Sequence, residues 1–577
     1  MKRFLAFWPL LTIIFALAFF LRIYKVADTP HDLYVDEVSI GWNAYSILKT
    51  GKDEYGVTLP LWFKAFGEYK LPVYIYLTTL AELFIGANAL AVRLPSVVLG
   101  TLTVGLITLL VDQLTQNKKL ALLTGLLLAI LPMSLHFSRA GYEANAALFF
   151  VTIGTYLVIK AFNVIPAPIK SAGIYQKRIL GQTENDNQTI SLFFLGLVCF
   201  ILVLYTYNSA RFFVPPFFLC LVRIYWNKLI SLLTYKLTWL MLLICLILVI
   251  PFVSFVNSPA GSIRATQEMY INDYPKGAPL TYTAMVPWSI NHYWRNYAKY
   301  FSFDFLFFTG DPIGRHGTRE NGVAYVWQLP LFILGLIYSV KSIINNRQTK
   351  SPVNEIFLSW LLIAPITAAF GGHNPHAVRS LNLVVPFSYF TAVGVIQLVS
   401  VFSSQFSVFG SKLTSFQLIR LKNREPTNYH QTTENRKLIT GMIYLVLSFT
   451  VGYFLFSYLH IYYVHYPNRT SPDWSGGYKE ALDFVFAHEN QYQKVALTKS
   501  LNNGYAYLYF YGQFNPAEVN TSAHPKTGFG KYEFVDTPYF SLPKTLYVAQ
   551  PTDSGSGQQV AQIKNKSGDV QYYIWEN

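Results

Sequence analysis

The chain has 577 residues, of which 52% are hydrophobic and only 13% are charged. This composition excludes a disordered chain and is typical of an integral membrane protein with some aqueous mass. The formal net charge of +15 does not indicate a nucleic-acid partner, because no soluble basic domain is evident that could carry such a function.

The first apolar segment, residues 4–23, is long enough to cross a bilayer at a rise of 1.5 Å per residue. Segments of similar character recur along the chain and bring the predicted number of transmembrane helices to about eleven. The others lie near residues 94–112, 119–136, 145–163, 190–207, 212–227, 237–256, 323–341, 355–371, 380–401 and 438–461. The sequence therefore predicts a polytopic α-helical membrane protein whose transmembrane domain covers residues 1–463.

The basic residues predict the orientation of these segments. Lys2 and Arg3 precede the first segment, and the other basic clusters fall on the same predicted side of the membrane. Those clusters are Lys118 and Lys119, residues 160–178, 223–236 and 341–350, and the polar loop 402–437. Because short basic loops stay in the cytoplasm, we expect a multi-pass protein of the plasma (inner) membrane with a cytoplasmic N-terminus.

An odd number of spans places residues 464–577 outside the cytoplasm, where we predict a small α/β domain. Residues 476–488 have helical spacing of their apolar positions. Four short stretches rich in β-branched and aromatic residues are predicted as strands. They are residues 494–498, 505–511, 545–549 and 571–575. All three cysteines lie in predicted spans, so this domain folds without disulfides and has no cysteine metal site.

The first outer loop, residues 24–93, carries an acidic pair directly after the first span. Acidic side chains such as Asp36 and Glu37 are costly at this depth unless they serve solvent, a cation or chemistry. Further along, the stretch 70–87 begins at Lys70 and is apolar but interrupted by a proline and a glutamate. We predict that it is an amphipathic helix in the outer interface.

The second outer loop, residues 257–322, is long and rich in aromatic residues, and it contains the turn-rich stretch 309–317. Loops of this length without regular structure are uncommon unless they line a site. Two interpretations stay open: a cover on the outer surface, or a wall of an active site.

Other outward charges lie at the mouths of predicted helices. They are Arg139 and Glu143 after the third span, Arg211 between two later spans, and His376 and Arg379 before the tenth. Each alone is more often an interfacial anchor or a salt-bridge partner. Together, however, the basic residues among them lie on the outer side of the membrane, the same side as Asp36, where the positive-inside rule disfavours cations. A cavity that binds a lipid-borne phosphate would explain both signs of charge.

Transfer of a sugar from a polyprenyl phosphate would use such a set of residues. A carboxylate near the acceptor takes its proton, and cations stabilise the charge that develops on the leaving phosphate. One carboxylate opposite the departing phosphate implies single displacement with inversion. We assign Asp36 as the base with Glu37 beside it, and Lys70, Arg379 and Arg139 to the donor phosphate. Candidate substrate contacts are Glu143, Arg211 and His376.

A cofactor is not required by this pattern. Asp36, Glu37, Glu143 and His376 are residue types that could hold a divalent metal ion, but no spacing in the sequence demands one. The metal dependence stays open at this stage.

At these residues the chain resembles the family 39 glycosyltransferases of the GT-C fold, which include protein O-mannosyltransferases and aminoarabinose transferases that modify lipid A. The matching stretches are Asp36-Glu37, Glu68 to Pro72, Gly86 to Ser96, Ser138 to Glu143 and Pro375 to Arg379. They cover the N-terminal two-fifths well and one later helix mouth.

The resemblance implies a GT-C-like catalytic transmembrane domain, a lipid-phosphate sugar donor and a C-terminal extracytoplasmic domain. It assigns the acid after the first span to Asp36 and the lysine before the interfacial helix to Lys70. The family often has Lys-Pro-Pro where this chain has Lys70-Leu71-Pro72, which loosens the alignment at the start of that helix.

Two other functions remain open. The first is a transferase or ligase that uses a lipid-linked oligosaccharide. The second is a transporter of lipids or solutes, although transporters usually place ionisable residues near the middle of the membrane and often contain inverted repeats. The sequence names neither the sugar nor the acceptor, which could be a lipid, a glycan or a protein.

Overall fold

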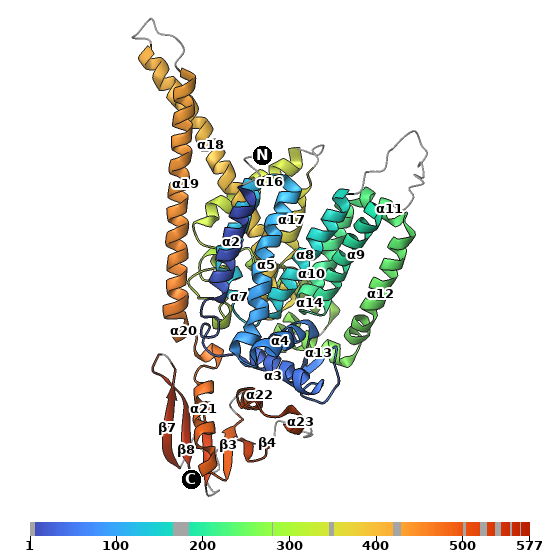
Figure 1. The fold of residues 1–577 in the computed structure, drawn as a ribbon, viewed down its shortest axis with the longest axis vertical. Coiled ribbons are helices and arrows are strands. Elements are labelled where there is room, and N and C mark those ends of the chain that lie inside the picture. Colours follow the sequence, from blue (N-terminus) through green and yellow to red (C-terminus); the bar gives the residue numbers. More distant parts are fainter. Residues whose placement is uncertain are drawn as a thin grey trace.

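The computed structural model describes residues 6–164, 184–277, 279, 281–345, 351–418, 428–499, 503–519, 528–536, 544–553, 557–565 and 567–577. Its main body is a bundle of long apolar helices, and a mixed β-sheet lies at one end (Figure 1). Helices α3 (Val35–Thr50) and α4 (Pro72–Ile85) lie between the bundle and this sheet.

Each of the predicted apolar segments is helical. The corresponding helices are α2 (Phe7–Ile23), α5 (Ala89–Thr115), α6 (Lys118–Ile130) with α7 (Pro132–Phe137), α8 (Glu143–Val164), α9 (Glu184–Leu204), α10 (Ala210–Ile224), α12 (Lys236–Val256), α16 (Gln328–Asn345), α17 (Val353–Ile363), α18 (Val384–Leu418) and α19 (Asn428–His460). The polytopic helical membrane fold that the sequence predicts is therefore confirmed.

Within the described residues, eight helices are long and apolar enough to cross a membrane. A ninth results if α10 and α11 (Trp226–Leu233), which meet at 90°, form one broken span. The predicted count of about eleven is higher because α2 and α6 are short, with 17 and 13 residues. Helix α6 ends at Ile130, since Leu131 precedes Pro132 and has extended backbone angles.

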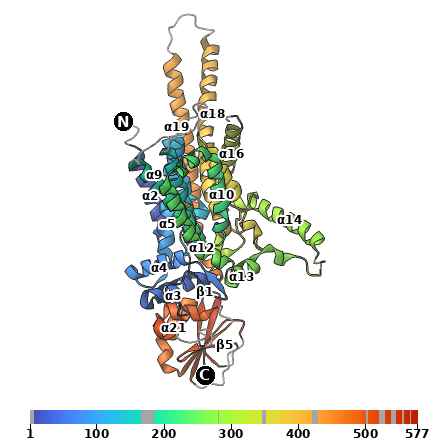
Figure 2. The same ribbon diagram turned by 90° about the vertical axis from the view of Figure 1, so that its right-hand side faces the viewer.

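The basic loop predicted at residues 402–437 is partly helical. Helix α18 continues to Leu418 and α19 begins at Asn428, whereas residues 419–427 lie outside the described residues. Both views show the two helices projecting together from the end of the bundle opposite the sheet (Figures 1 and 2). Most of the predicted basic segment 160–178 also lies outside the described residues.

The second outer loop divides into a peripheral part and an inner part. Its helices are α13 (Pro259–Glu268), α14 (Tyr282–Lys299) and α15 (Phe303–Phe307). Helix α14 projects sideways from the bundle (Figure 2) and exposes an apolar stripe of residues four positions apart, Tyr282, Val286, Ile290 and Trp294. Such a stripe is typical of a helix that lies in the membrane interface. The inner part begins after α15 and contacts the candidate site.

The C-terminal sheet has the strand order β4-β5-β3-β6-β8-β7. The strands are β3 (Lys494–Thr498), β4 (Gly528–Phe529), β5 (Tyr532–Val535), β6 (Thr545–Ala549), β7 (Gln558–Lys564) and β8 (Val570–Glu576). Strand β3 pairs in parallel with β5 and β6, and β8 adds antiparallel to β6. Strands β3, β6 and β8 and the helix α21 (Tyr478–His488) lie where the sequence predicts them.

The strand predicted at residues 505–511 is wrong, because this segment forms helix α22 (Gly504–Tyr511). It connects β3 to β5, and two parallel strands need a crossover connection, which is usually helical. Every residue of α22 except Tyr511 is buried. Its apolar residues are therefore continuous, and their pattern has neither the two-residue period of a strand nor the 3.6-residue period of a helix.

A shared core joins α3 and α4 to the C-terminal elements. Val38 and Trp42 of α3 pack in one cluster with Leu482, Val495 and Leu508. The chains approach closely at Gly41, where an added Cβ would lie 2.5 Å from Cε2 of Phe510. The C-terminal region therefore braces the helix that carries the acidic pair. The division of the chain into domains at residue 464 stays a prediction.

Candidate active site

The two acids of the pair have different environments. Helix α3 begins at Val35, so Asp36 lies in its first turn, where the helix dipole favours a negative charge. The side chain of Asp36 is 36% exposed, whereas that of Glu37 is completely buried. Only Asp36 can therefore reach a substrate directly.

A short hairpin places Lys70 against Asp36. Strands β1 (Phe63–Ala65) and β2 (Glu68–Lys70) pair with Phe63 opposite Lys70. The two residues between the strands, Phe66 and Gly67, both have positive φ, as a tight hairpin turn requires. Lys70 is buried, and its Nζ donates a hydrogen bond to Oδ1 of Asp36 at 2.5 Å.

Three carboxylates keep Lys70 charged. Burial by itself would lower the pKa of this lysine, but the negative charges of Asp36, Glu143 and Glu68 outweigh burial and raise its pKa above the ordinary value. Glu143 is the first residue of α8. The structure thus brings Asp36, Lys70 and Glu143 into one electrostatic group with a fixed ammonium at its centre.

Glu37 forms an internal ion pair with Arg93, a residue of α5. Nε and Nη2 of Arg93 donate to the two carboxylate oxygens at 2.9 and 3.0 Å. The backbone N–H groups of Gly141 and Tyr34 also donate to this carboxylate, at 2.7 and 3.3 Å. Since every lone pair of Glu37 faces a donor and the pair is fully buried, the geometry gives Glu37 a positioning role in place of the catalytic one.

Replacing Glu37 with glutamine should mainly destabilise the fold. Removing one partner of a buried, hydrogen-bonded pair leaves the other charge uncompensated, at a cost of about 3–5 kcal/mol. We expect a clearly lower Tm for Glu37→Gln, measured by thermal unfolding of the purified protein in detergent. Lys479→Gln is the control, because its pair with Asp483 is half exposed and spans one helical turn. An inactive Glu37→Gln with an unchanged Tm would restore the catalytic assignment.

Arg139 is also an internal anchor. Its Nη1 donates to the carbonyl oxygens of Leu21 and Arg22 at 2.8 and 3.0 Å, and its Nη2 donates to those of Tyr24 and Thr29 at 2.7 and 3.0 Å. These carbonyls belong to the end of α2 and the following loop. Both Nη groups are thereby committed, so the geometry does not favour the phosphate contact that the sequence suggests for Arg139.

The other predicted cations lie on neighbouring elements. The carbonyl of Tyr205 accepts a hydrogen bond from the N–H of Val73, just after Lys70. Six residues later, the guanidinium of Arg211 lies 5.1 Å from the ring centre of Phe252. The hydroxyl of Ser209 donates to the carbonyl of Arg379 at 3.4 Å. These contacts place the backbones of the Arg211 and Arg379 segments side by side and next to the hairpin of Lys70.

A residue that the sequence does not single out, Arg315, lies near Tyr34 and Asp36. It belongs to η2 (Gly314–His316), in the inner part of the second outer loop, and its guanidinium lies 5.4 Å from the ring centre of Tyr34. Burial would lower the pKa of Arg315, but tyrosine hydroxyls and the carboxylates of Asp36 and Asp473 raise it. This part of the loop therefore lines the site, as one of the two interpretations of the sequence predicts.

A cavity of about 440 Å³ opens beside these residues. Tyr34, Val35 and Arg315 line one side, and the C-terminal region supplies the rest, including Asp473, Ser475, Tyr478, Tyr507, Gln550 and Tyr572. A volume of this size suits a small polar ligand such as a sugar. The cavity adjoins the residue before Asp36, so a ligand in it would approach the exposed carboxylate.

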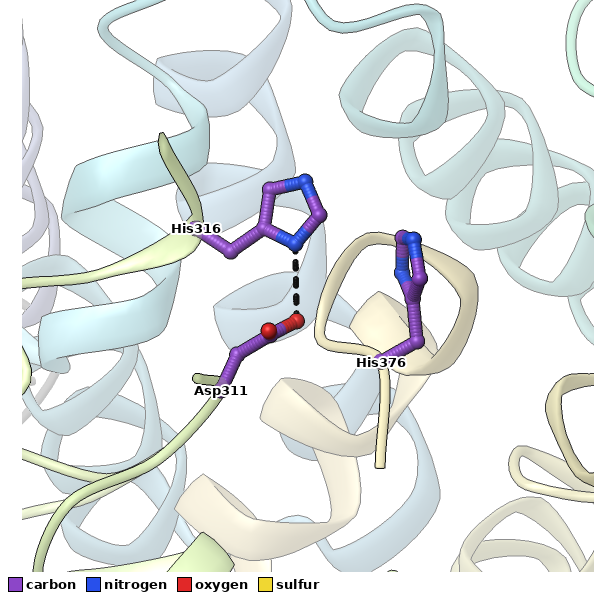
Figure 3. Close-up of side chains that lie close together, drawn as sticks. All are labelled: Asp311, His316 and His376. Atoms are coloured by element: carbon purple, nitrogen blue, oxygen red, sulfur yellow. Dashed lines mark hydrogen bonds and ion pairs between the residues drawn. The ribbon is translucent and has the colours of Figure 1, made fainter. Parts of the chain in front are cut away.

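The sequence groups His376 with Asp36, Glu37 and Glu143 as residues that could hold a metal ion. In the structure His376 lies instead beside Asp311 and His316 (Figure 3). A second group of potential ligands is formed by His31, Asp32 and Glu480. Within the described residues, neither group contains the catalytic candidate Asp36.

Comparisons with known proteins give a family match and a shared fold. Residues 12–260 match the model of the dolichyl-phosphate-mannose-protein mannosyltransferase family, which confirms the resemblance to family 39. A search of curated protein sequences finds no match to this chain.

Two solved structures of ArnT show the same fold. ArnT of Cupriavidus metallidurans bound to undecaprenyl phosphate superposes with a TM-score of 0.52 and 10% identity, covering 99% of this chain and 98% of that one. The apo structure of ArnT gives a TM-score of 0.50, 10% identity and coverage of 98% and 97%. The archaeal oligosaccharyltransferase AglB of Archaeoglobus fulgidus gives 0.48, 12% identity and coverage of 94% and 69%.

The fold is thus that of the GT-C membrane glycosyltransferases. The family match over the segment that carries Asp36, Lys70 and Glu143 supports a membrane glycosyltransferase of the GT-C type.

Proposed function

We propose that this protein transfers a sugar from a polyprenyl-phosphate donor to an acceptor on the extracytoplasmic side of the membrane, with inversion at the anomeric carbon. The observation that carries the proposal is the pair formed by Asp36 and Lys70. One member is an accessible carboxylate, the other is a buried cation, and their contact is 2.5 Å long. Such a transfer needs one group of each kind, a base for the acceptor and a cation for the leaving phosphate.

Lys70 is the proposed partner of the donor phosphate. Its ammonium is held by buried packing and by three neighbouring carboxylates, so it is already oriented before the substrate arrives. An ammonium has three donor hydrogens. Lys70 can therefore bind a phosphate oxygen and either keep its hydrogen bond to Asp36 or give it up. Release would turn an ion-paired carboxylate into a stronger base at the moment when the donor is bound.

Asp36 is the proposed base. Its position in the first turn of α3, next to the cavity residues Tyr34 and Val35, lets it accept the proton of an acceptor hydroxyl or amine. The attacking atom then displaces the phosphate in a single step, the polyprenyl phosphate leaves with the electron pair of the glycosidic bond, and Asp36 takes the proton. Glu37 and Arg93 hold the helix that carries this base.

The cavity under the C-terminal region is the proposed site of the acceptor. Arg315 and Asp473 supply charges of both signs on its wall, and Tyr478 and Tyr507 supply flat aromatic surfaces, a lining that suits a polar acceptor such as a glycan. We keep Arg379 as a proposed contact of the donor phosphate, and Arg211 and Glu143 as proposed substrate contacts. Arg139 is left out because its Nη groups bind backbone carbonyls, and His376 is left out because it lies beside Asp311 and His316. The basic loops support a cytoplasmic N-terminus in the inner membrane.

The proposal can be tested with the purified protein in liposomes. Polyprenyl-monophosphate monosaccharides and polyprenyl-diphosphate oligosaccharides would be offered separately, and the release of polyprenyl phosphate would be measured. We expect turnover with a monophosphate donor and an inverted anomeric linkage in the product. Turnover of diphosphate oligosaccharides only would identify an oligosaccharide transferase. Transbilayer movement of the lipid without its cleavage would identify a transporter.

A further inference from the structure

A group of one carboxylate and two imidazoles, with Asp311 and His316 buried and His376 partly buried, lies apart from the Asp36–Lys70 pair. Asp311 and His316 flank the turn after α15, and His376 comes from the loop before η4 (Val378–Leu383) (Figure 3). One ligand atom from each side chain lies within 4.8 Å of the other two. Asp311 and His316 are only 3% and 7% exposed. Two segments far apart in the chain thus converge on one point inside the protein.

We propose that Asp311, His316 and His376 bind a divalent transition-metal ion, with zinc the best match. Two imidazoles and one carboxylate form a common zinc ligand set, and three protein ligands leave a coordination position for water. Imidazole ligands disfavour magnesium and calcium, which prefer oxygen atoms only. This inference rests on the local geometry and is independent of the transferase reaction.

The carboxylate of Asp311 is already oriented for this role. Its Oδ2 lies 2.7 Å from Nδ1 of His316 and accepts the N–H of Ala377 at 2.6 Å, while its Oδ1 accepts the N–H of Ile313 at 2.8 Å. Ligand atoms about 2.0–2.2 Å from a tetrahedral zinc ion lie about 3.3 Å apart. The ion could therefore enter between Oδ2 of Asp311 and Nδ1 of His316 if these two atoms moved roughly half an ångström further apart.

A small cavity adjoins two of the three residues, Asp311 and His316. Its volume is about 20 Å³, and Asp311, His316 and His136 are among its lining residues, so it has room for about one water molecule. Nε2 of His136 lies 2.7 Å from the carbonyl oxygen of Arg315, which can only accept, so Nε2 carries the proton. Nδ1 of His136 is buried and has no hydrogen-bond partner among the described residues. It would be able to accept a hydrogen bond from a water bound to the ion.

The ion would have a positioning role. It would tie the turn of η2 to the segment that leads from His376 to Arg379. Arg315 is the neighbour of His316 and faces Tyr34 in the main cavity, so fixing His316 also fixes Arg315. The group of His31, Asp32 and Glu480 is a weaker candidate, because Glu480 is half exposed and two of the three residues are adjacent in the chain.

The test uses the full-length protein purified without a polyhistidine tag and stripped with a chelator. Titration with Co²⁺ should give the visible absorption of a four-coordinate site, and metal analysis after Zn²⁺ loading should find about one ion per chain. His316→Ala and His376→Gln should each weaken metal binding by about 10-fold or more, whereas the matched control His31→Ala should bind as the wild type does. Zn²⁺ should also raise the Tm of the wild type and not that of His376→Gln.

The wild-type titration decides the question even if the variants fail to fold. A wild-type protein that takes up no cobalt would overturn the proposal. Retention of the ion by both His316→Ala and His376→Gln would overturn it as well, and loss of the ion from His31→Ala alone would move the site to the second group.

Discussion

Replacing Asp36 with asparagine is expected to lower the rate of sugar transfer by about 10²- to 10⁴-fold, the range typical of a lost general base. Asparagine has almost the shape of aspartate, and its carbonyl oxygen can still accept the hydrogen bond from Lys70 that now measures 2.5 Å. It cannot take a proton from the acceptor. We therefore expect donor binding and the Tm to change little, and the loss to fall on kcat, measured with the donor that the liposome assay identifies.

The matched control for this substitution is Glu68→Gln. Glu68, like Asp36, is a carboxylate that raises the pKa of Lys70, and it lies in the same hairpin as Lys70. Glu68→Gln therefore removes one negative charge near Lys70, as Asp36→Asn does. We expect a loss below 10-fold for this control. Equal losses in the two variants would mean that the negative charge near Lys70 matters and that Asp36 is not the base. Near-normal turnover of Asp36→Asn would remove it from the mechanism.

The transmembrane helices could be predicted because a chain inside a lipid bilayer has few possible backbone conformations. A backbone inside a bilayer must satisfy its hydrogen bonds within the segment, so long apolar runs become helices. The runs at residues 94–112 and 145–163 accordingly lie within α5 and α8. Outside the membrane this constraint is absent. Residues 505–511 have a composition typical of a strand, yet the parallel pairing of β3 with β5 makes them a helix.

The residues of the candidate site could be predicted only where the sign of their charge and their side of the membrane were enough to identify them. Asp36 and Lys70, 34 residues apart, are both expected on the outer face, and they meet. An arginine that binds phosphate and an arginine that caps a helix look alike in sequence. Arg139 is distinguished only by the four carbonyl groups that its Nη atoms contact. Arg315 lies in an irregular loop without periodicity, so no sequence pattern indicates that it reaches Tyr34.

Lys70→Ala is expected to reduce kcat by about 10²- to 10³-fold, the cost of removing one preorganised group that stabilises developing charge. Negative charge on the phosphate grows as the glycosidic bond breaks, so the ammonium should stabilise the transition state more than the bound donor. The KM for the donor should therefore rise by less than 10-fold. The substitution also frees Asp36 from its ion pair, and this carboxylate is partly exposed, so the proposed base stays in place and accessible.

Lys64→Ala is the matched control, because Lys64 lies on the other strand of the same hairpin and is exposed, with its ammonium 5.1 Å from the ring centre of Tyr55. It should keep wild-type kcat and Tm. Lys70→Arg should recover only part of the activity, since a planar guanidinium does not reproduce the buried point charge of an ammonium. If Lys70→Ala instead keeps full kcat and weakens only the affinity for the acceptor, Lys70 belongs to the acceptor site. The developing charge on the phosphate must then be met by Arg379 and Arg211, whose segments lie beside the hairpin.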